Sequence, residues 1–248
     1  MKRINAIILV VIVSVFAMIV TSCQKEEEQI EGALPGLFSV SDNQKVRFSK
    51  GNLQYQASTN TWRFAEQQYS YGDLFGWGTG NNPSLSSVND LDYATFTDWG
   101  NNPIVNGGNA PNMWRTLTQA EWDYLIKKRP GKSGRGIVGG CTGMIILPDS
   151  WKQPSGCADL VPGYENFNNY SLPEWVEMES AGAVFLPETK YNAEPHTAGR
   201  GPYGVYWSST PYGEYNAYRL FLYLTGVGNA WTVARCVRHN KCSVRLVR

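Results

Sequence analysis

Short runs in which apolar and polar residues alternate recur along much of the chain and predict several short β-strands. In the N-terminal third, turn-forming Gly, Asn and Ser residues separate these runs. The runs are Leu37–Val40, Lys45–Phe48, Leu53–Tyr55 and Trp62–Phe64. Gly143–Pro148 and Ala183–Leu186 are mostly apolar and predict buried strands. Between Gly72 and Asn112 the chain is rich in Gly, Asn, Asp and Pro, so we expect a long loop there.

Two segments change from strand-like alternation to helical spacing. Thr118 and Glu121 have the capping-box pattern, and the apolar residues that follow recur on one helical face until Pro130-Gly131 ends the helix. A second helix is predicted over Leu172–Ser180. Two helices among many short strands and long loops predict an α+β fold class.

The C-terminal segment alternates most regularly. One face of a predicted strand carries apolar residues and Tyr, while the other carries Arg and aromatic residues. The first set is Tyr218, Leu220, Leu222 and Leu224, and the second is Arg219, Phe221 and Tyr223. In the next run, Asn229, Trp231, Val233 and Arg235 alternate with small residues. We therefore expect a core face and a contact face.

The N-terminus resembles a bacterial lipoprotein signal peptide. Two basic residues precede the apolar run Ile4–Val20, and small residues lead from it to Cys23. The resemblance implies a signal peptide over residues 1–22 and acylation of Cys23. The acidic residues that follow resemble the export signal of Bacteroides-like surface lipoproteins, which implies a flexible tether over residues 23–36 and a cell-surface position on the outer membrane. A transmembrane helix is the alternative, but the apolar run is short for one.

Composition narrows the possible partners. The 248 residues, 42% of them hydrophobic, suit one large domain over residues 37–248. The net charge of +1 becomes −1 when Lys2 and Arg3 leave with the signal peptide, so we expect no nucleic-acid partner. Aromatic residues make up 13% of the chain, and their rigid amphipathic rings suit protein or carbohydrate surfaces.

Three motifs resemble those of the C-type lectin-like superfamily: Trp114–Trp122, Gly204–Ser209 and Ser243–Val247. The first is most similar to the formylglycine-generating-enzyme-like branch. The other two are similar to Bacteroides surface lipoproteins that include the variable proteins of diversity-generating retroelements. The resemblance implies a C-type lectin-like domain with two helices, a mixed short-strand sheet and long loops, in which residues from about 206 to 248 form the variable region.

In such variable proteins, a fixed scaffold carries diversified residues that bind ligands. The fixed positions would be Trp207, Ser208, Ser209, Ala217, Leu220, Val227, Arg235 and Ser243–Val247. The ligand-binding positions would be Tyr212, Glu214, Tyr215, Arg219, Phe221, Tyr223, Asn229, Trp231, Val233, Arg235, His239 and Asn240. The resemblance implies a receptor-like or adhesin-like protein that binds a protein or glycan, for which another cell or a phage is a candidate source. The resemblance also implies that the protein contacts the membrane only through its lipid anchor. The sequence departs from this pattern at Lys241-Cys242.

Two other functions remain open. Formylglycine-generating enzymes use a closely spaced thiol pair to bind copper and activate oxygen, and Cys236 and Cys242 are the candidates for such a pair. Their spacing fits that motif poorly, and a disulfide or two chance thiols are the alternatives. Cys141 and Cys157 could also pair outside the cytoplasm. The remaining function is a structural subunit of a surface assembly.

Patterns for metal binding are weak. His196 and His239 are the only histidines, and neither has a second ligand at a suitable spacing. Asp90, Asp92 and Asp98 could bind Ca²⁺ through oxygen but lack regular calcium-loop spacing. We therefore expect no metal, no cofactor and no catalytic residue.

Overall fold

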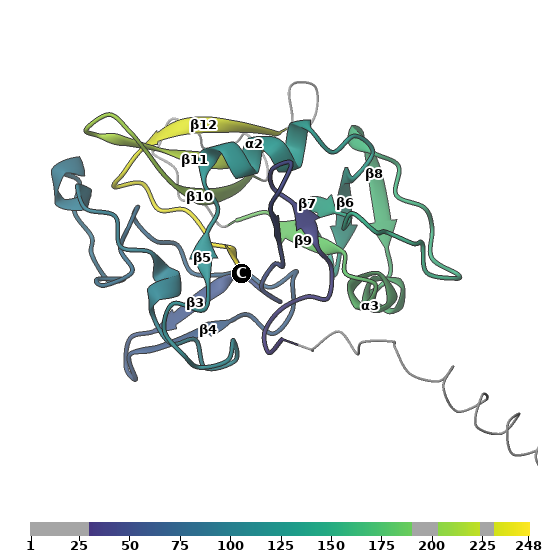
Figure 1. Cartoon of the computed structure of the whole chain (residues 1–248), viewed down its shortest axis with the longest axis horizontal. Helices are drawn as coiled ribbons and strands as arrows, with labels where there is room; N and C mark the ends of the chain where they lie inside the picture. Colours follow the sequence, from purple (N-terminus) through teal and green to yellow (C-terminus); the bar gives the residue numbers. More distant parts are fainter. Residues whose placement is uncertain (1–29, 190–202, 224–230) are drawn as a thin grey trace, which may run out of the picture.

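The computed structural model describes residues 30–189, 203–223 and 231–248 as a mixed α/β protein (Figure 1). Its two described α-helices are α2 (Gln119–Lys127) and α3 (Leu172–Ser180). The strands are β1 (Phe38–Ser39), β2 (Lys45–Val46), β3 (Leu53–Gln56), β4 (Thr61–Phe64), β5 (Arg115–Thr116), β6 (Ser133–Val138), β7 (Cys141–Ile146), β8 (Gly163–Tyr170), β9 (Val184–Pro187), β10 (Tyr203–Tyr212), β11 (Asn216–Tyr223), β12 (Trp231–Val237) and β13 (Leu246–Val247).

Several sequence predictions fall outside the described residues. These are the signal peptide with Cys23, and the positions Leu224, Val227 and Asn229. Within the described ranges, no helix is both long enough and apolar enough to cross a membrane.

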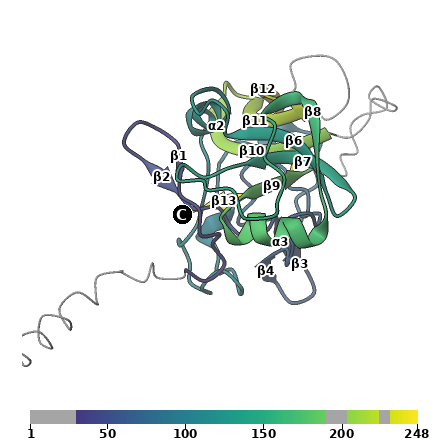
Figure 2. The ribbon, with the colours of Figure 1, turned by 90° about the vertical axis from the view of Figure 1, so that its right-hand side faces the viewer.

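A four-stranded sheet has the order β8-β6-β7-β9, with β6 parallel to β8 and antiparallel to β7. Because successive side chains point to opposite faces, β7 and β9 send Met144 and Leu186 into one core cluster and Ile145 and Phe185 into another. The helix α3 closes the second cluster with Trp175. Figure 2 shows α3 on the opposite side of this sheet from the β10–β12 sheet.

A second sheet has the order β10-β11-β12 and is antiparallel throughout. The helix α2 lies against it and buries Trp122 and Leu125 in the first core cluster (Figure 1). The predicted capping box opens this helix: the Glu121 N–H donates to the Thr118 hydroxyl at 3.2 Å, and the Thr118 N–H donates to the Glu121 carboxylate at 2.7 Å. Arg115 pairs with the same carboxylate.

The segment from Gly72 to Asn112 is irregular, as predicted, and packs on the domain through its own aromatic side chains. Trp77 and Trp99 are fully buried in a third core cluster. The Trp77 indole N–H donates to the Ser208 carbonyl on β10 at 2.9 Å. This long loop is therefore part of the core that supports the C-terminal strands.

The predictions of both helices and of the mixed α and β composition are confirmed, but β6 and β8 were not predicted. β6 is rich in glycine, which disfavours a strand prediction, but a Cβ on Gly134 would lie 2.8 Å from the Val161 carbonyl oxygen, so the close approach of the backbone favours glycine there. The polar residues of β8 give no apolar alternation from which a strand could be predicted. Its Asn168 is buried and satisfies the Val161 N–H and C=O, a role that alternation does not reveal.

The packed domain begins before residue 37. Leu34 is buried in the first core cluster, and Ala33 forms a β-bridge with Ser49. The end of the predicted 23–36 tether is therefore part of the folded domain.

Asp149 connects three segments and makes stability sensitive to acid. Its carboxylate accepts hydrogen bonds from the Ser39 N–H and hydroxyl and pairs with Lys45 and Arg129, each at 3.0 Å. Partial burial raises the pKa of Asp149, but these hydrogen bonds and charges outweigh it and lower the pKa to about 2. A carboxyl group with a lowered folded-state pKa stabilises the fold above its unfolded pKa, and this stabilisation disappears as the pH falls through the folded pKa.

We expect Asp149→Asn to lower the free energy of unfolding at pH 7 by about 1–2 kcal/mol. The variant should also lose less stability than the wild type between about pH 4 and about pH 2. Urea unfolding across this range measures both effects. Parallel pH profiles for the two proteins would contradict the prediction.

Candidate ligand-binding surface

The pairing of β11 with β12 divides the expected ligand-binding residues between two faces. On β11, Arg219, Phe221 and Tyr223 share a face, as predicted. Leu222 is the direct partner of Trp231, so Trp231 shares the opposite face with Leu222. Alternation defines the faces within one strand, whereas register decides which faces combine. The prediction of one contact face across both strands is therefore wrong.

Trp231 and Val233 lie on the face of the sheet that carries α2. Both are partly buried against the core cluster that contains Leu220 and Leu222. Val233 therefore packs against the core with part of its surface, although the sequence placed it among the contact residues.

A group of aromatic and charged side chains, the hairpin cluster, lies around the turn between β10 and β11 and comprises Tyr212, Tyr215, Tyr218 and Arg235. Arg235 Nη1 donates to the Tyr212 hydroxyl at 2.9 Å, and the guanidinium carbon lies 4.7 Å from the Tyr212 ring centroid. The Tyr218 ring meets the Tyr212 ring edge-on at 5.4 Å. Tyr212 and Tyr215 remain 41% and 49% exposed. A hydrogen bond with the neighbouring Glu214 raises the pKa of Tyr215.

The turn that carries the hairpin cluster is fixed by Arg238. Gly213 adopts a left-handed φ of 60°, which glycine tolerates without strain. Arg238 donates to the Gly213 carbonyl at 2.9 Å and to the Asn216 carbonyl at 3.2 Å. Its guanidinium also lies 4.5 Å from the centroid of the buried Trp77 ring. The buried arginine therefore connects the exposed turn to the core.

A second aromatic group lies on the other face of the sheet. The Phe221 ring lies 5.4 Å from the Tyr203 ring and 5.8 Å from the Tyr223 ring, and Arg219 lies 5.2 Å above the Phe221 ring. All four residues are half-buried, and Phe221 packs against the third core cluster. This group presents less surface for contact than the hairpin cluster.

His239 and Asn240 form contacts within the protein. The His239 backbone N–H donates to Asp90 at 2.9 Å, and its Nδ1 lies 2.9 Å from the same oxygen. The Asn240 amide donates to the Cys236 sulfur at 3.1 Å. Both side chains therefore help to position the last loop, and the structure does not join them to the hairpin cluster.

The three candidate calcium ligands have separate partners. Asp90 contacts His239, Asp92 accepts from the Ser87 hydroxyl, and Asp98 accepts from the N–H and hydroxyl of Thr116. In the described part of the chain, no three His, Cys, Asp or Glu side chains are grouped so that they could hold a metal ion.

The four described cysteines are free thiols, and two of them interact. A hydrogen bond from the Cys242 thiol lowers the pKa of Cys236 to about 6, and the Arg219 charge and the Asn240 amide add to this effect against burial. Burial raises the pKa of Cys242. The pair therefore resembles a thiolate beside a thiol, and both residues are buried.

Alkylation by iodoacetamide should show an apparent pKa near 6 at Cys236, well below those of Cys141 and Cys157, because burial raises the pKa of both. Replacing Cys242 by alanine removes the hydrogen-bond donor and should raise the apparent pKa of Cys236, whereas Cys242→Ser keeps a donor and should raise it less. Mass spectrometry across a pH series measures these values. Equal apparent pKa values in the wild type and Cys242→Ala would contradict the assignment.

Sequence reasoning missed three residues of this region. The alternation placed Tyr218 on the core face of the strand with Leu220 and Leu222, but its ring contacts the exposed Tyr212. Tyr203 immediately precedes the Gly204–Ser209 motif, and Arg238 has no periodic neighbour that would mark it as an anchor.

In comparisons with known proteins, no family model, curated protein or solved structure matches this chain.

Proposed function

We propose that this chain is a surface-anchored, ligand-binding protein of the receptor or adhesin type, and that the hairpin cluster is its main contact surface. The exposed and supported position of Tyr212 carries the proposal: the residue is 41% exposed, while Arg235 bonds its hydroxyl and Tyr218 contacts its ring. Tyr and Arg are favoured at binding surfaces because a preorganised ring or guanidinium provides contact area at low entropic cost. The ligand is a protein or a glycan.

Contacts among the three motifs support the proposal of a C-type lectin-like scaffold. β13, within Ser243–Val247, pairs with β5, within Trp114–Trp122. The Trp207 N–H donates to the Ser243 carbonyl at 3.0 Å, and the Ser209 N–H donates to the Leu117 carbonyl at 2.9 Å. The segments that carry the resemblance thus form one structural unit.

Burial distinguishes four of the candidate scaffold positions from Tyr212, although Arg235, which the resemblance also places in the scaffold, is exposed. Trp207, Ser208, Ala217 and Leu220 have no exposed surface, whereas Tyr212 is among the exposed residues. Diversification by a retroelement would change exposed positions and spare these buried ones, because core substitutions destabilise the fold.

DNA sequencing around the coding region tests diversification. We expect a reverse transcriptase gene and a near-identical template repeat that differs from the codons for about 206–248 mainly at adenines. Differences spread evenly over buried and exposed codons would contradict this part of the proposal.

A direct test of binding begins with a ligand search. The purified domain is screened against a glycan array and a random peptide library displayed on phage. The binding of selected ligands is then compared between the wild type and a variant in which alanine replaces Tyr212, Tyr215 and Arg235 of the hairpin cluster. We expect selected ligands to depend on this cluster. Ligands that bind both proteins equally would show that the contact surface lies elsewhere.

The Cys236–Cys242 contact favours an oxidase of the formylglycine-generating type as a second candidate function, because such enzymes need a reactive thiol pair. Oxygen consumption by the copper-supplemented wild type, lost in Cys236→Ser, would support the oxidase. Ligand binding that survives this substitution would support the binding protein. Isolation of native outer-membrane complexes distinguishes these two functions from the third, a structural subunit, which would be recovered within a larger surface assembly.

A further inference from the structure

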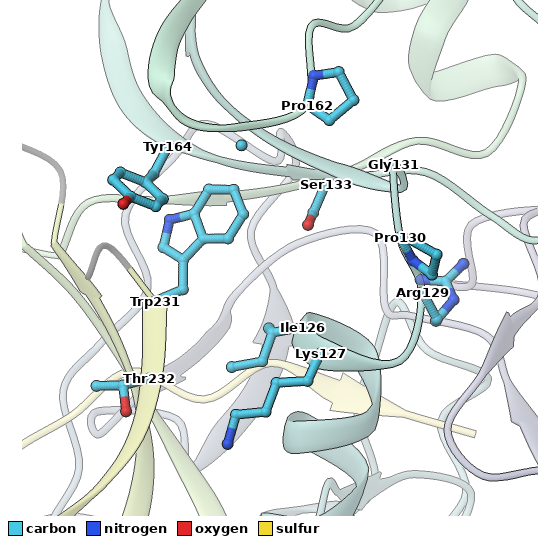
Figure 3. A pocket seen from close by; sticks show the side chains of 11 residues that line it. Ile126, Lys127, Arg129, Pro130, Gly131, Ser133, Pro162, Tyr164, Trp231 and Thr232 are labelled. Carbon is cyan, nitrogen blue, oxygen red and sulfur yellow. The ribbon is translucent and has the colours of Figure 1, made fainter. Parts of the chain in front are cut away.

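A cavity of about 630 Å³ lies where α2 ends and where β6, β8 and β12 begin (Figure 3). This volume falls within the range of about 300–1,000 Å³ that is common for small-molecule sites. The cavity is separate from the hairpin cluster, because Trp231 on its wall and Arg235 are four residues apart on β12, roughly 13 Å along the strand.

Trp231 forms an aromatic wall of this cavity. It packs against the first core cluster, together with Ile126 of α2, and is only partly buried, so the core supports the ring without covering it completely. Tyr164 at the start of β8 lies next to the indole (Figure 3). A supported indole provides a flat face with negative electrostatic potential, on which a ring with polarised C–H groups stacks favourably.

The opposite part of the wall is polar and has an accessible backbone. The Ser133 hydroxyl points into the space bordered by Trp231 (Figure 3). Gly131 and Gly163 also line the cavity, and no described atom lies within 4 Å of the place where a Cβ would lie on either, so the main chain is accessible at both glycines. Hydroxyl and peptide groups both donate and accept hydrogen bonds, as a ligand with several hydroxyl groups requires.

The charges around the cavity are compensated, which indicates a neutral ligand. Lys127 pairs with Asp123, and Arg129 pairs with Asp149 at 3.0 Å. Among the residues that the structure describes, no Asp or Glu side chain lines the cavity. The described part of the wall therefore offers neither an unpaired cation for an anionic ligand nor a carboxylate for a cationic one.

From this combination we propose that the cavity binds a neutral hexopyranose unit, which stacks on Trp231 and is hydrogen-bonded by the Ser133 hydroxyl and the neighbouring backbone. The site goes beyond the proposed function, because it lies on a different part of β12 from the hairpin cluster and does not depend on a ligand there.

Saturation-transfer NMR with the methyl glycosides of glucose, galactose and mannose tests the site. We expect transfer from the wild-type protein to at least one glycoside, strongest at the C–H groups on one ring face. Trp231→Ala should weaken binding by about tenfold or more, and Trp231→Phe, which keeps an aromatic face, by about threefold. Val88→Ala, at a site that is 87% exposed and outside the cavity wall, is the control that should leave binding unchanged.

The thermal unfolding of each variant is measured alongside, and Trp231→Phe and Ser133→Ala replace Trp231→Ala if that variant does not fold. Absence of transfer to all three glycosides, or equal binding by wild type and both Trp231 variants, would overturn the proposal. Tighter binding of methyl glucuronide than of methyl glucoside would overturn the assignment of a neutral ligand. A variant that lacks the hairpin cluster should keep glycoside binding, so the two sites can fail independently.

Discussion

Replacing Trp207 by alanine is expected to lower the free energy of unfolding by about 3–5 kcal/mol, the usual cost of truncating a buried tryptophan. Trp207 has no exposed surface, and its indole N–H donates to the Phe75 carbonyl at 2.7 Å. Its own carbonyl accepts from the Trp122 indole at 3.4 Å. The substitution would therefore open a cavity between the C-terminal sheet and the long loop, in the third core cluster.

Urea unfolding of Trp207→Ala and Trp207→Phe measures this effect. The phenylalanine variant should lose less stability, because it fills most of the volume and the Phe75 carbonyl keeps a second donor, the Cys242 N–H at 3.0 Å. Val176→Ala, at a position 59% exposed on α3, is the surface control and should change stability by less than about 0.5 kcal/mol. A loss below about 1 kcal/mol in Trp207→Ala would contradict the structural role given to this residue.

Combined replacement of Tyr212, Tyr215 and Arg235 by alanine is expected to weaken ligand binding by about 100-fold or more. Each of the three substitutions removes a large exposed side chain. The Arg235 substitution also removes the donor of the 2.9 Å hydrogen bond to the Tyr212 hydroxyl. A few Tyr and Arg residues commonly carry most of the binding energy of a surface, and their effects are not additive. Ligands selected on the wild type provide the measurement, by titration calorimetry.

A matched control replaces three exposed apolar residues elsewhere, Phe167, Leu172 and Val176, by alanine. The control should bind ligand as the wild type does. Both triple variants should retain most of the folding stability, because exposed side chains contribute little to it. Binding that is unchanged in the hairpin variant, or reduced equally in both variants, would argue against the assigned surface.

Local sequence patterns predicted the helices well because their signals are local. Thr118 and Glu121 form the capping box that the sequence suggested, and Leu172–Ser180 is the observed extent of α3. The strands were harder to predict where packing reverses the usual preference. Gly134 in β6 is favoured by the close approach of the Val161 carbonyl, and a single sequence shows the glycine but not the neighbour.

The candidate site shows the same limit. Alternation placed Phe221 and Tyr223 on one face of β11 correctly, yet strand register determined that Trp231 belongs to the other face. Register depends on contacts between residues distant in sequence, so periodicity within each run could not supply it. Tyr212 and Tyr215 were expected as contact residues only through the resemblance to variable proteins, and periodicity played no part in that expectation; the structure shows that both are exposed.

Hydrogen exchange of the protein with and without a selected ligand is the most direct test of the proposed contact surface. Ligand binding at the hairpin cluster should slow exchange of the backbone amides from Tyr212 to Tyr218 and around Arg235, while the amides of Phe221 and Tyr223 exchange at unchanged rates. Protection confined to Tyr203, Phe221 and Tyr223, with no change from Tyr212 to Tyr218, would contradict the proposal and assign binding to the other face of the sheet.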